Sequence, residues 1–425
     1  MTPASFDIGA ADRRHVWHPY TQHETADEPL AIVRAQGAYL YDQSGRAIFD
    51  AVSSWWVTLH GHAQPEIAAA IAAQAATLEQ VIFAGFTHEP AARLASELVA
   101  RAPAGLSRVF FSDNGSTAIE VAIKIALQYW QNRGEARGLV AAMDNAYHGD
   151  TFGAMSVSGR GLFTAPFAAQ LFEVARLPDP VDSDVVAAFE TLIAHRGNEI
   201  AALIVEPMLM GAGGMRMWPA DALRGLRELA TAHGILLIAD EVLTGFGRTG
   251  PLFACNNANI SPDIMCLSKG ITGGFIPFAA TLATEAIFDV FRSKDFSKTL
   301  FHGHSYTANP IACAAALASL ALLDDRSAER RRSIERAHTK AAARLASVPN
   351  IKNVRVLGTV LALEVRSHDS GYTSATGPAL RRFALEAGVL LRPLGDTVYI
   401  LPPYCATEAD LTLAYDTIAR FAETR

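Results

Sequence analysis

Cysteine is scarce in this chain, with four residues (Cys255, Cys266, Cys313 and Cys405) among 425. They lie far apart, so they form none of the close pairs that bind structural metals, and they are too few for a disulfide-rich secreted domain. We therefore expect free thiols, no metal site and a reducing compartment, the cytoplasm.

Long apolar runs and runs of one charge are missing as well. Residues 1–15 contain no apolar core of a signal peptide, and the most apolar stretch, residues 311–323, is too short to span a bilayer. Asp324 and Asp325 end that stretch, so we expect a buried helix there. The 36 basic and 43 acidic residues give a net charge of -7. This mild, scattered charge does not indicate a nucleic-acid partner or a polybasic membrane surface.

Hydrophobic residues make up 50% of the chain, enough for a large core and more than one domain. Short apolar runs alternate with helical stretches, such as residues 117–131 and 220–233. The predicted strands are residues 108–112, 139–143, 201–205, 235–239, 264–267 and 279–283. Continuous apolar strands separated by helices predict an α/β fold with a mainly parallel sheet covered on both faces.

The pattern changes after Asp324. A charged helix over residues 328–345 is followed by two-strand patterns near residues 354–365 and 389–401, which predicts a smaller α+β domain. The first sixty residues are rich in turns and aromatics, and we expect them to join it. The predicted parts are residues 1–60 (N-terminal part of the small domain), 61–325 (large domain) and 326–425 (C-terminal part of the small domain).

Polar residues follow several predicted strands, where ligands bind in open α/β sheets. Residues 112–116 (Ser-Asp-Asn-Gly-Ser) join a strand to a helix, whose N-terminus is suited to a phosphate, although a capped turn would explain this motif alone. Asp240 follows an apolar run. Its carboxylate could bind a metal, act as a base, hold a protonated ring nitrogen or cap the next segment.

Lys269 is the most informative of the six lysines. It alone closes an apolar strand and enters a glycine-rich loop, residues 270–275. Burying an amine is costly and lowers its pKa towards nucleophilic use. The alternative is a lysine at a strand end whose charge reaches solvent.

These positions together meet the needs of one cofactor, pyridoxal phosphate (PLP). PLP requires an amine for its aldehyde, a carboxylate beside its pyridine nitrogen, an anion cradle and an aromatic face. Lys269, Asp240 and the turn at Ser116 supply the first three, and Tyr147 supplies the ring. We interpret Lys269 as the Schiff-base lysine and proton shuttle, and Asp240 as the partner of the ring nitrogen.

The chain resembles the class III, fold-type I aminotransferases over essentially its whole length. The motifs that carry the resemblance are Asn-Gly-Ser-Thr-Ala-Ile-Glu (114–120), Tyr-His-Gly (147–149), Ile-Val-Glu-Pro (204–207), Ala-Asp-Glu-Val-Leu-Thr-Gly-Phe-Gly-Arg-Thr-Gly (239–250) and Leu-Ser-Lys-Gly (267–270). The 29-residue step from Asp240 to Lys269 is typical of the family. The resemblance implies a seven-stranded, mainly parallel sheet and a homodimer with shared active sites. It also implies that Gly115, Ser116 and, from the neighbouring subunit, Ser305 bind the cofactor.

Within the class, the chain is most similar to members that aminate 8-amino-7-oxononanoate to 7,8-diaminononanoate in biotin biosynthesis. The segments that carry this similarity are residues 17–22, 53–61, 149–156, 211–217, 392–395 and 401–404. The similarity implies that Tyr20, Trp55, Tyr147 and Gly303 line the substrate pocket, with Tyr20 also taking part in catalysis. It implies that Arg392 pairs with the carboxylate at the far end of the keto substrate. Without it, Trp55 would be interpreted as core and Arg392 as a surface ion pair.

The amino donor is less well defined by the sequence. Members that use S-adenosylmethionine usually have His-Gly-Pro-Thr-Phe where this chain has His-Gly-His-Ser-Tyr at residues 302–306. The His-Ser-Tyr version resembles members that use lysine. We expect S-adenosylmethionine, with lysine as the alternative donor.

Two alternative functions remain at this stage. Another class III enzyme, an ω-amino-acid aminotransferase or an aminomutase, would use Lys269 and Asp240 equally well. A non-catalytic cofactor-binding regulator would normally carry a basic helix-turn-helix extension, and this sequence has none.

Overall fold

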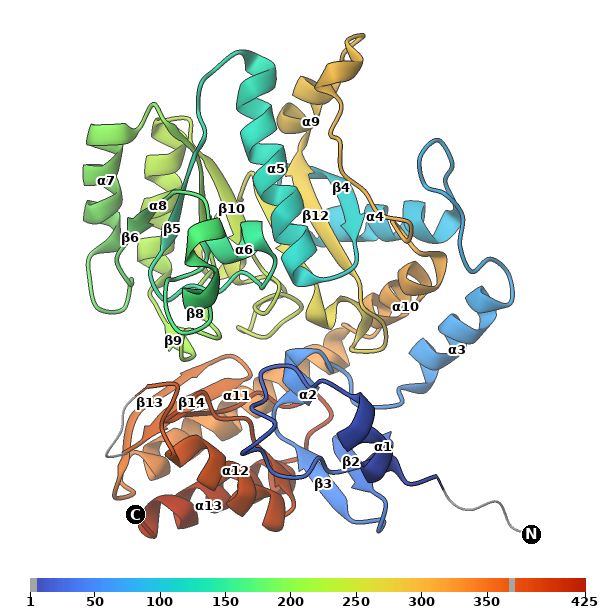
Figure 1. Cartoon of the computed structure of the whole chain (residues 1–425), viewed down its shortest axis with the longest axis vertical. Coiled ribbons are helices and arrows are strands. Elements are labelled where there is room, and N and C mark those ends of the chain that lie inside the picture. The colour runs from blue at the N-terminus through green and yellow to red at the C-terminus, as the bar shows by residue number, and fades with distance from the viewer. Residues whose placement is uncertain (1–5, 367–370) are drawn as a thin grey trace.

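The computed structural model describes residues 6–366 and 371–425; residues 1–5, which begin the predicted N-terminal part of the small domain, lie outside the described residues. Figure 1 shows an upper part built on a large sheet and a lower part that holds both the first and the last helices. The helix α2 (Ser53–Trp56) lies between the two parts.

The large sheet has seven strands and is mainly parallel, as predicted. β12 runs antiparallel to both of its neighbours, and the other paired strands are parallel. In spatial order the strands are β4 (Leu106–Ser112), β12 (Ala279–Thr284), β11 (Ile264–Leu267), β10 (Leu236–Asp240), β7 (Ile200–Val205), β5 (Leu139–Met143) and β6 (Val174–Leu177). The edge strand β6 was not among the predicted strands. It is short, contains Arg176 and is only partly buried, so it lacks a continuous apolar run.

Helices cover both faces of this sheet. Leu203 of β7 packs into one core with α7 and α8, whereas the next residue, Ile204, packs into another core with α5. Successive side chains of a strand point to opposite faces, so a strand buried on both faces reads as a continuous apolar run. The helices of this part are α3 (Pro65–Ala75), α4 (Glu89–Arg101), α5 (Gly115–Arg133), α6 (Phe152–Val157), α7 (Val185–Arg196), α8 (Ala220–Ala232), α9 (Glu285–Phe291) and α10 (Pro310–Ala321).

The predicted apolar helix near residues 311–323 is α10. Most of its residues are buried, and it contacts α3 and α4. In the described part of the chain, no helix is both long enough and apolar enough to cross a membrane.

The lower part joins segments from both ends of the chain. Its four-stranded sheet places β1 (Ile32–Gln36), β2 (Tyr39–Asp42) and β3 (Ala47–Asp50) beside β15 (Val389–Leu390). A three-stranded sheet contains β13 (Ile351–Leu357), β14 (Val360–Val365) and β16 (Thr397–Ile400). The helices of the lower part are α1 (Ile8–His15), α11 (Asp325–Leu345), α12 (Thr376–Glu386) and α13 (Glu408–Glu423). A separate small hairpin of β8 (Leu209–Met210) and β9 (Arg216–Met217) lies near the large sheet. β3 pairs with β15, so the N-terminal segment lies beside the C-terminal one; the predicted domains and their divisions at residues 60 and 325 stay predictions.

His338 of α11 connects three elements of the lower part. Its Nδ1 lies 2.6 Å from the hydroxyl of Tyr415 on α13, and its Nε2 lies 3.1 Å from the carbonyl oxygen of Thr359. A neutral ring that donates from Nε2 and accepts at Nδ1 satisfies both contacts. Burial lowers the pKa of His338 to about 4.

This buried imidazole predicts a pH-dependent loss of stability. The pKa of His338 is about 4 in the folded protein against an ordinary 6.5, so as pH falls through this window the unfolded chain binds the proton first and the free energy of unfolding decreases. His338→Gln should remove up to roughly 1.4 kcal/mol per pH unit of that slope. Urea unfolding at several pH values measures it, with His233→Gln at an exposed position as control. Equal slopes in the wild type and His338→Gln would contradict a neutral buried imidazole.

Candidate active site

The predicted cofactor residues meet at the carboxyl ends of the parallel strands. Asp240 ends β10, Lys269 follows β11, and Tyr147 follows β5. Together with Gly115 and Ser116 at the start of α5, they line one cavity of about 450 Å³. The strand ends of one sheet edge thus bring together residues that are far apart in the sequence.

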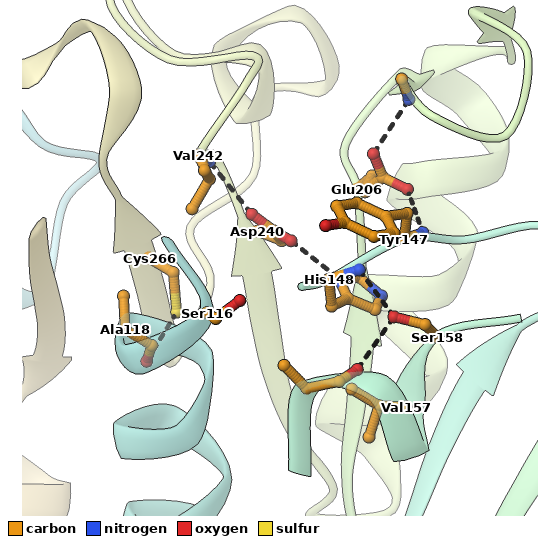
Figure 2. Close-up of polar contacts among 12 residues, drawn as sticks. Ser116, Ala118, Tyr147, His148, Val157, Ser158, Glu206, Asp240, Val242 and Cys266 are labelled. Carbon is orange, nitrogen blue, oxygen red and sulfur yellow. Dashed lines mark hydrogen bonds and ion pairs between the residues drawn. The ribbon is translucent and has the colours of Figure 1, made fainter. Parts of the chain in front are cut away.

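The carboxylate of Asp240 is fixed by two contacts (Figure 2). Its Oδ1 accepts a hydrogen bond from the backbone N–H of Val242 at 3.0 Å, and its Oδ2 lies 2.7 Å from Nδ1 of His148. The backbone N–H of His148 donates to the hydroxyl of Ser158 at 2.8 Å. Asp240 therefore does cap the local turn, as one alternative held, and it also lines the cavity in a set orientation.

Lys269 reaches the same cavity from β11. Burial lowers the pKa of Lys269, while the carboxylates of Asp240 and Glu206 act against this shift. Its Nζ lies 5.2 Å from the ring centroid of Trp56. A lowered pKa increases the fraction of neutral amine, which is the nucleophilic form.

Glu206 is a site residue that sequence reasoning did not single out, although it lies in one of the family motifs. It follows β7 and is buried. Its Oε1 accepts from the backbone N–H of Tyr147 at 2.8 Å and its Oε2 from that of Gly211 at 2.9 Å, so it holds the segment that carries the aromatic ring (Figure 2). Burial raises the pKa of Glu206 to about 7. Its position after a buried strand is the same signal that identified Asp240.

The start of α5 lies at the cavity and has the features of an anion-binding site. Asn114 caps the helix by accepting from the backbone N–H of Thr117 at 3.0 Å. Helix geometry leaves the N–H groups of the first turn without intrahelical partners, and the helix dipole favours an anion there. The hydroxyl oxygen of Ser116 accepts from the N–H of Asp150 at 2.9 Å, which leaves its proton available for a phosphate oxygen. Amine, carboxylate, ring and anion cradle thus all fit PLP.

A second cavity of about 440 Å³ adjoins the first, because Trp56, Tyr147 and Lys269 line both. Tyr20 and Trp55 line it too, with their rings edge to face at 5.7 Å. The Tyr20 hydroxyl donates to Asp150 and lies 3.3 Å from the hydroxyl of Tyr147. Burial, with the Asp150 hydrogen bond, raises the pKa of Tyr20 to about 12, so its phenol keeps its proton at neutral pH.

Arg392 stacks on Trp55 in this second cavity. Its guanidinium carbon lies 3.7 Å from the centroid of the Trp55 ring. In the described residues, no carboxylate lies within ion-pair distance of Arg392, which differs from the surface ion pair considered above. Trp55 is half-buried beside the cavity, whereas its neighbour Trp56 is buried and its Nε1 donates to the hydroxyl of Tyr399 at 3.0 Å.

The backbone that carries both tryptophans is left-handed. Residues 53–56, here called the tryptophan turn, have φ angles of 50°, 44°, 72° and 75°. Each non-glycine residue in this conformation costs roughly 1–2 kcal/mol. The Ser-Ser-Trp-Trp segment contains no glycine, so no local sequence signal indicates this conformation.

Gly303 and Ser305 do not line either cavity in the described chain. Both are exposed, and the carbonyl oxygen of Ser305 accepts from Nε2 of Gln80 at 2.6 Å. Their predicted roles in substrate and phosphate binding stay predictions.

Comparison with known proteins identifies the family of this chain. The family model for class III aminotransferases matches residues 20–421. An adenosylmethionine-8-amino-7-oxononanoate aminotransferase from Synechococcus elongatus is 51% identical over 416 residues, covering 95% of this chain and 97% of that protein.

Solved structures agree with this assignment. An adenosylmethionine-8-amino-7-oxononanoate aminotransferase from Methanocaldococcus jannaschii matches with a TM-score of 0.94 at 35% identity, covering 98% of both chains. An amine transaminase from an uncultivated Pseudomonas species, solved with PLP bound, matches with a TM-score of 0.86 at 34% identity, covering 96% of this chain and 98% of that one. These matches confirm the predicted fold class, and this chain belongs to the class III aminotransferases.

Proposed function

We propose that this protein uses PLP to convert 8-amino-7-oxononanoate into 7,8-diaminononanoate, a step of biotin biosynthesis. The two relatives from Synechococcus elongatus and Methanocaldococcus jannaschii carry this substrate in their names. The observation that carries the proposal is the pair of adjoining cavities, with the amine of Lys269 where they meet and Arg392 in the second.

The residues of the first cavity have distinct roles in the proposal. Asp240, oriented by His148, holds a proton on the ring nitrogen of PLP, and the start of α5 with Ser116 binds its phosphate. When bound, PLP supplies an electron-accepting ring that stabilises negative charge on the reacting carbon of the substrate. Lys269, once its amine is free, moves the proton at that carbon.

The second cavity selects the keto substrate. The guanidinium of Arg392 binds the terminal carboxylate, and Trp55 and Tyr20 pack along the apolar chain. Fixing the far end of a long substrate determines where its ketone lies relative to Lys269. The uncharged phenols of Tyr20 and Tyr147 add polar contacts at the reacting end.

S-adenosylmethionine is the proposed amino donor, because the relatives' names include it. Lysine stays the alternative because of the His-Ser-Tyr sequence at residues 304–306. A homodimer, in which Ser305 reaches the phosphate site of the neighbouring subunit, is also part of the proposal. So is a cytoplasmic location, which fits the four free cysteines.

The direct test of this function is product formation. We expect purified, PLP-loaded protein to form 7,8-diaminononanoate from 8-amino-7-oxononanoate with S-adenosylmethionine, as detected by mass spectrometry. Lysine at matched concentration should give less product. Lys269→Ala is the control and should lose essentially all turnover, because both the covalent anchor and the proton-moving amine are gone. If only lysine supports product formation, lysine is the amino donor. If the enzyme converts other ω-amino acids but not 8-amino-7-oxononanoate, the proposed substrate is wrong.

Arg392→Ala should weaken binding of the keto substrate selectively. Loss of a charged contact in a desolvated site costs roughly 2–4 kcal/mol, which would appear mainly in KM for 8-amino-7-oxononanoate. Arg392→Lys keeps the charge but loses the planar guanidinium. Its KM for 8-amino-7-oxononanoate should therefore lie between those of the wild type and Arg392→Ala. The donor half-reaction, followed by cofactor absorbance, should stay nearly intact. An equal loss of rate in both half-reactions would show that Arg392 does not act only on the carboxylate of the keto substrate.

A further inference from the structure

Asp50, at the end of β3, holds the tryptophan turn with its buried carboxylate. Its Oδ1 accepts from the backbone N–H groups of Val52 at 3.3 Å and Ser54 at 3.0 Å. Its Oδ2 accepts from the hydroxyl of Ser54 at 2.8 Å and lies 2.8 Å from Nε2 of His62. Both oxygens therefore have two partners, and three of the four contacts reach residues within or beside the turn.

The contact to His62 ties this carboxylate to a second part of the chain. The backbone of His62 pairs with Gly37, whose N–H donates to the His62 carbonyl at 3.1 Å and whose carbonyl accepts at 2.7 Å. The side chain of Asp50 is fully buried and that of His62 is 13% exposed, so water competes little for these contacts. The acceptor for the turn is thus tied to a second segment of the chain.

The same residue lies beside the strand that leads to Arg392. Asp50 is the register partner of Leu390 in the parallel pairing of β3 with β15. Two residues after Leu390 the chain reaches Arg392, which stacks on Trp55 at 3.7 Å. One short stretch of sheet therefore sets the positions of both the ring and the guanidinium.

We propose that Asp50 is a positioning residue for substrate selection, which holds the tryptophan turn in its left-handed conformation and so places Trp55 under Arg392. Four successive non-glycine residues with positive φ do not keep this conformation without compensating contacts. Asp50 accepts from the N–H and the hydroxyl of Ser54 within the turn, and from the N–H of Val52 just before it. The effect on the substrate rests on the proposed function, whereas the effect on the turn does not.

Asp42 offers a matched control in the same sheet. Its Oδ1 accepts from the N–H groups of Ser44 at 2.9 Å and Arg46 at 3.0 Å and from the hydroxyl of Ser44 at 2.6 Å. It is nearly buried, at 7% exposure, and it holds the β2–β3 turn, which lines neither cavity. Asp42→Ala removes a similar network without touching the substrate pocket.

The experiment compares Asp50→Ala with Asp42→Ala in the full-length PLP-loaded enzyme. We expect Asp50→Ala to raise KM for 8-amino-7-oxononanoate roughly tenfold or more, with a smaller fall in kcat, because the Arg392 stack is displaced. Acrylamide should quench tryptophan fluorescence more strongly in Asp50→Ala, since the turn carries two of the five tryptophans. PLP should stay bound, because Asp240, Ser116 and Lys269 come from the upper part of the molecule. Asp42→Ala should lower the thermal midpoint and leave KM and quenching at wild-type values.

Asp50→Asn serves as the conservative variant. Its carbonyl oxygen can still accept from Val52 and Ser54, but its amide replaces the acceptor facing the Ser54 hydroxyl and His62. It should therefore give KM and quenching values between those of the wild type and Asp50→Ala. If Asp50→Ala does not fold, Asp50→Asn is compared with Asp42→Asn, and a KM rise of roughly threefold or more in the former alone supports the proposal.

Two results would overturn the role of Asp50. One is unchanged KM and quenching in Asp50→Ala; the other is an equal change in Asp42→Ala, which would reveal a general loss of stability. If the wild-type protein does not turn over 8-amino-7-oxononanoate at all, the proposed function fails, and the quenching comparison then decides the role of Asp50 by itself.

Discussion

The site depends on the electrostatic interaction between Asp240, at the end of β10, and Lys269, which follows the neighbouring strand β11. Asp240 is buried and Lys269 is partly buried. The parallel pairing of β10 with β11 sets Asp240 opposite Cys266, three residues before the lysine. Burial favours the neutral amine of Lys269, and the nearby carboxylate limits how far its pKa falls. The hydrogen bond of Asp240 to His148 then fixes where the negative charge lies. The other features of the site serve to place a cofactor and a substrate around this pair.

The two parts of the molecule contribute to different sides of the reaction. The large sheet and α5 supply the cofactor residues, all of them at strand ends or at a helix start. The lower part and the tryptophan turn supply Arg392, Trp55 and Tyr20 around the second cavity. Lys269 lines both cavities, so the proposed chemistry occurs where the two cavities meet.

Much of this could be predicted from the sequence, because buried parallel strands are continuous apolar runs and functional residues follow them. That logic located Asp240, Lys269 and Tyr147, although it did not single out Glu206 in an equivalent position. The strand β6 was missed because its edge position leaves it short and mixed in polarity. The tryptophan turn was missed for another reason: its left-handed backbone depends on acceptors such as Asp50 and not on a local glycine signal. Gly303 and Ser305 line neither cavity, and their roles are expected from the family resemblance alone.

The most direct measurement of the central claim is the rate of the donor half-reaction in Asp240→Asn. The amide can still accept from the N–H of Val242, so the local turn and the fold should persist. A neutral amide cannot hold a proton on the ring nitrogen, so the rate constant should fall by roughly two orders of magnitude or more while PLP stays bound. An unchanged rate constant together with a large drop in the thermal midpoint would contradict the account, because Asp240 would then be only a structural cap.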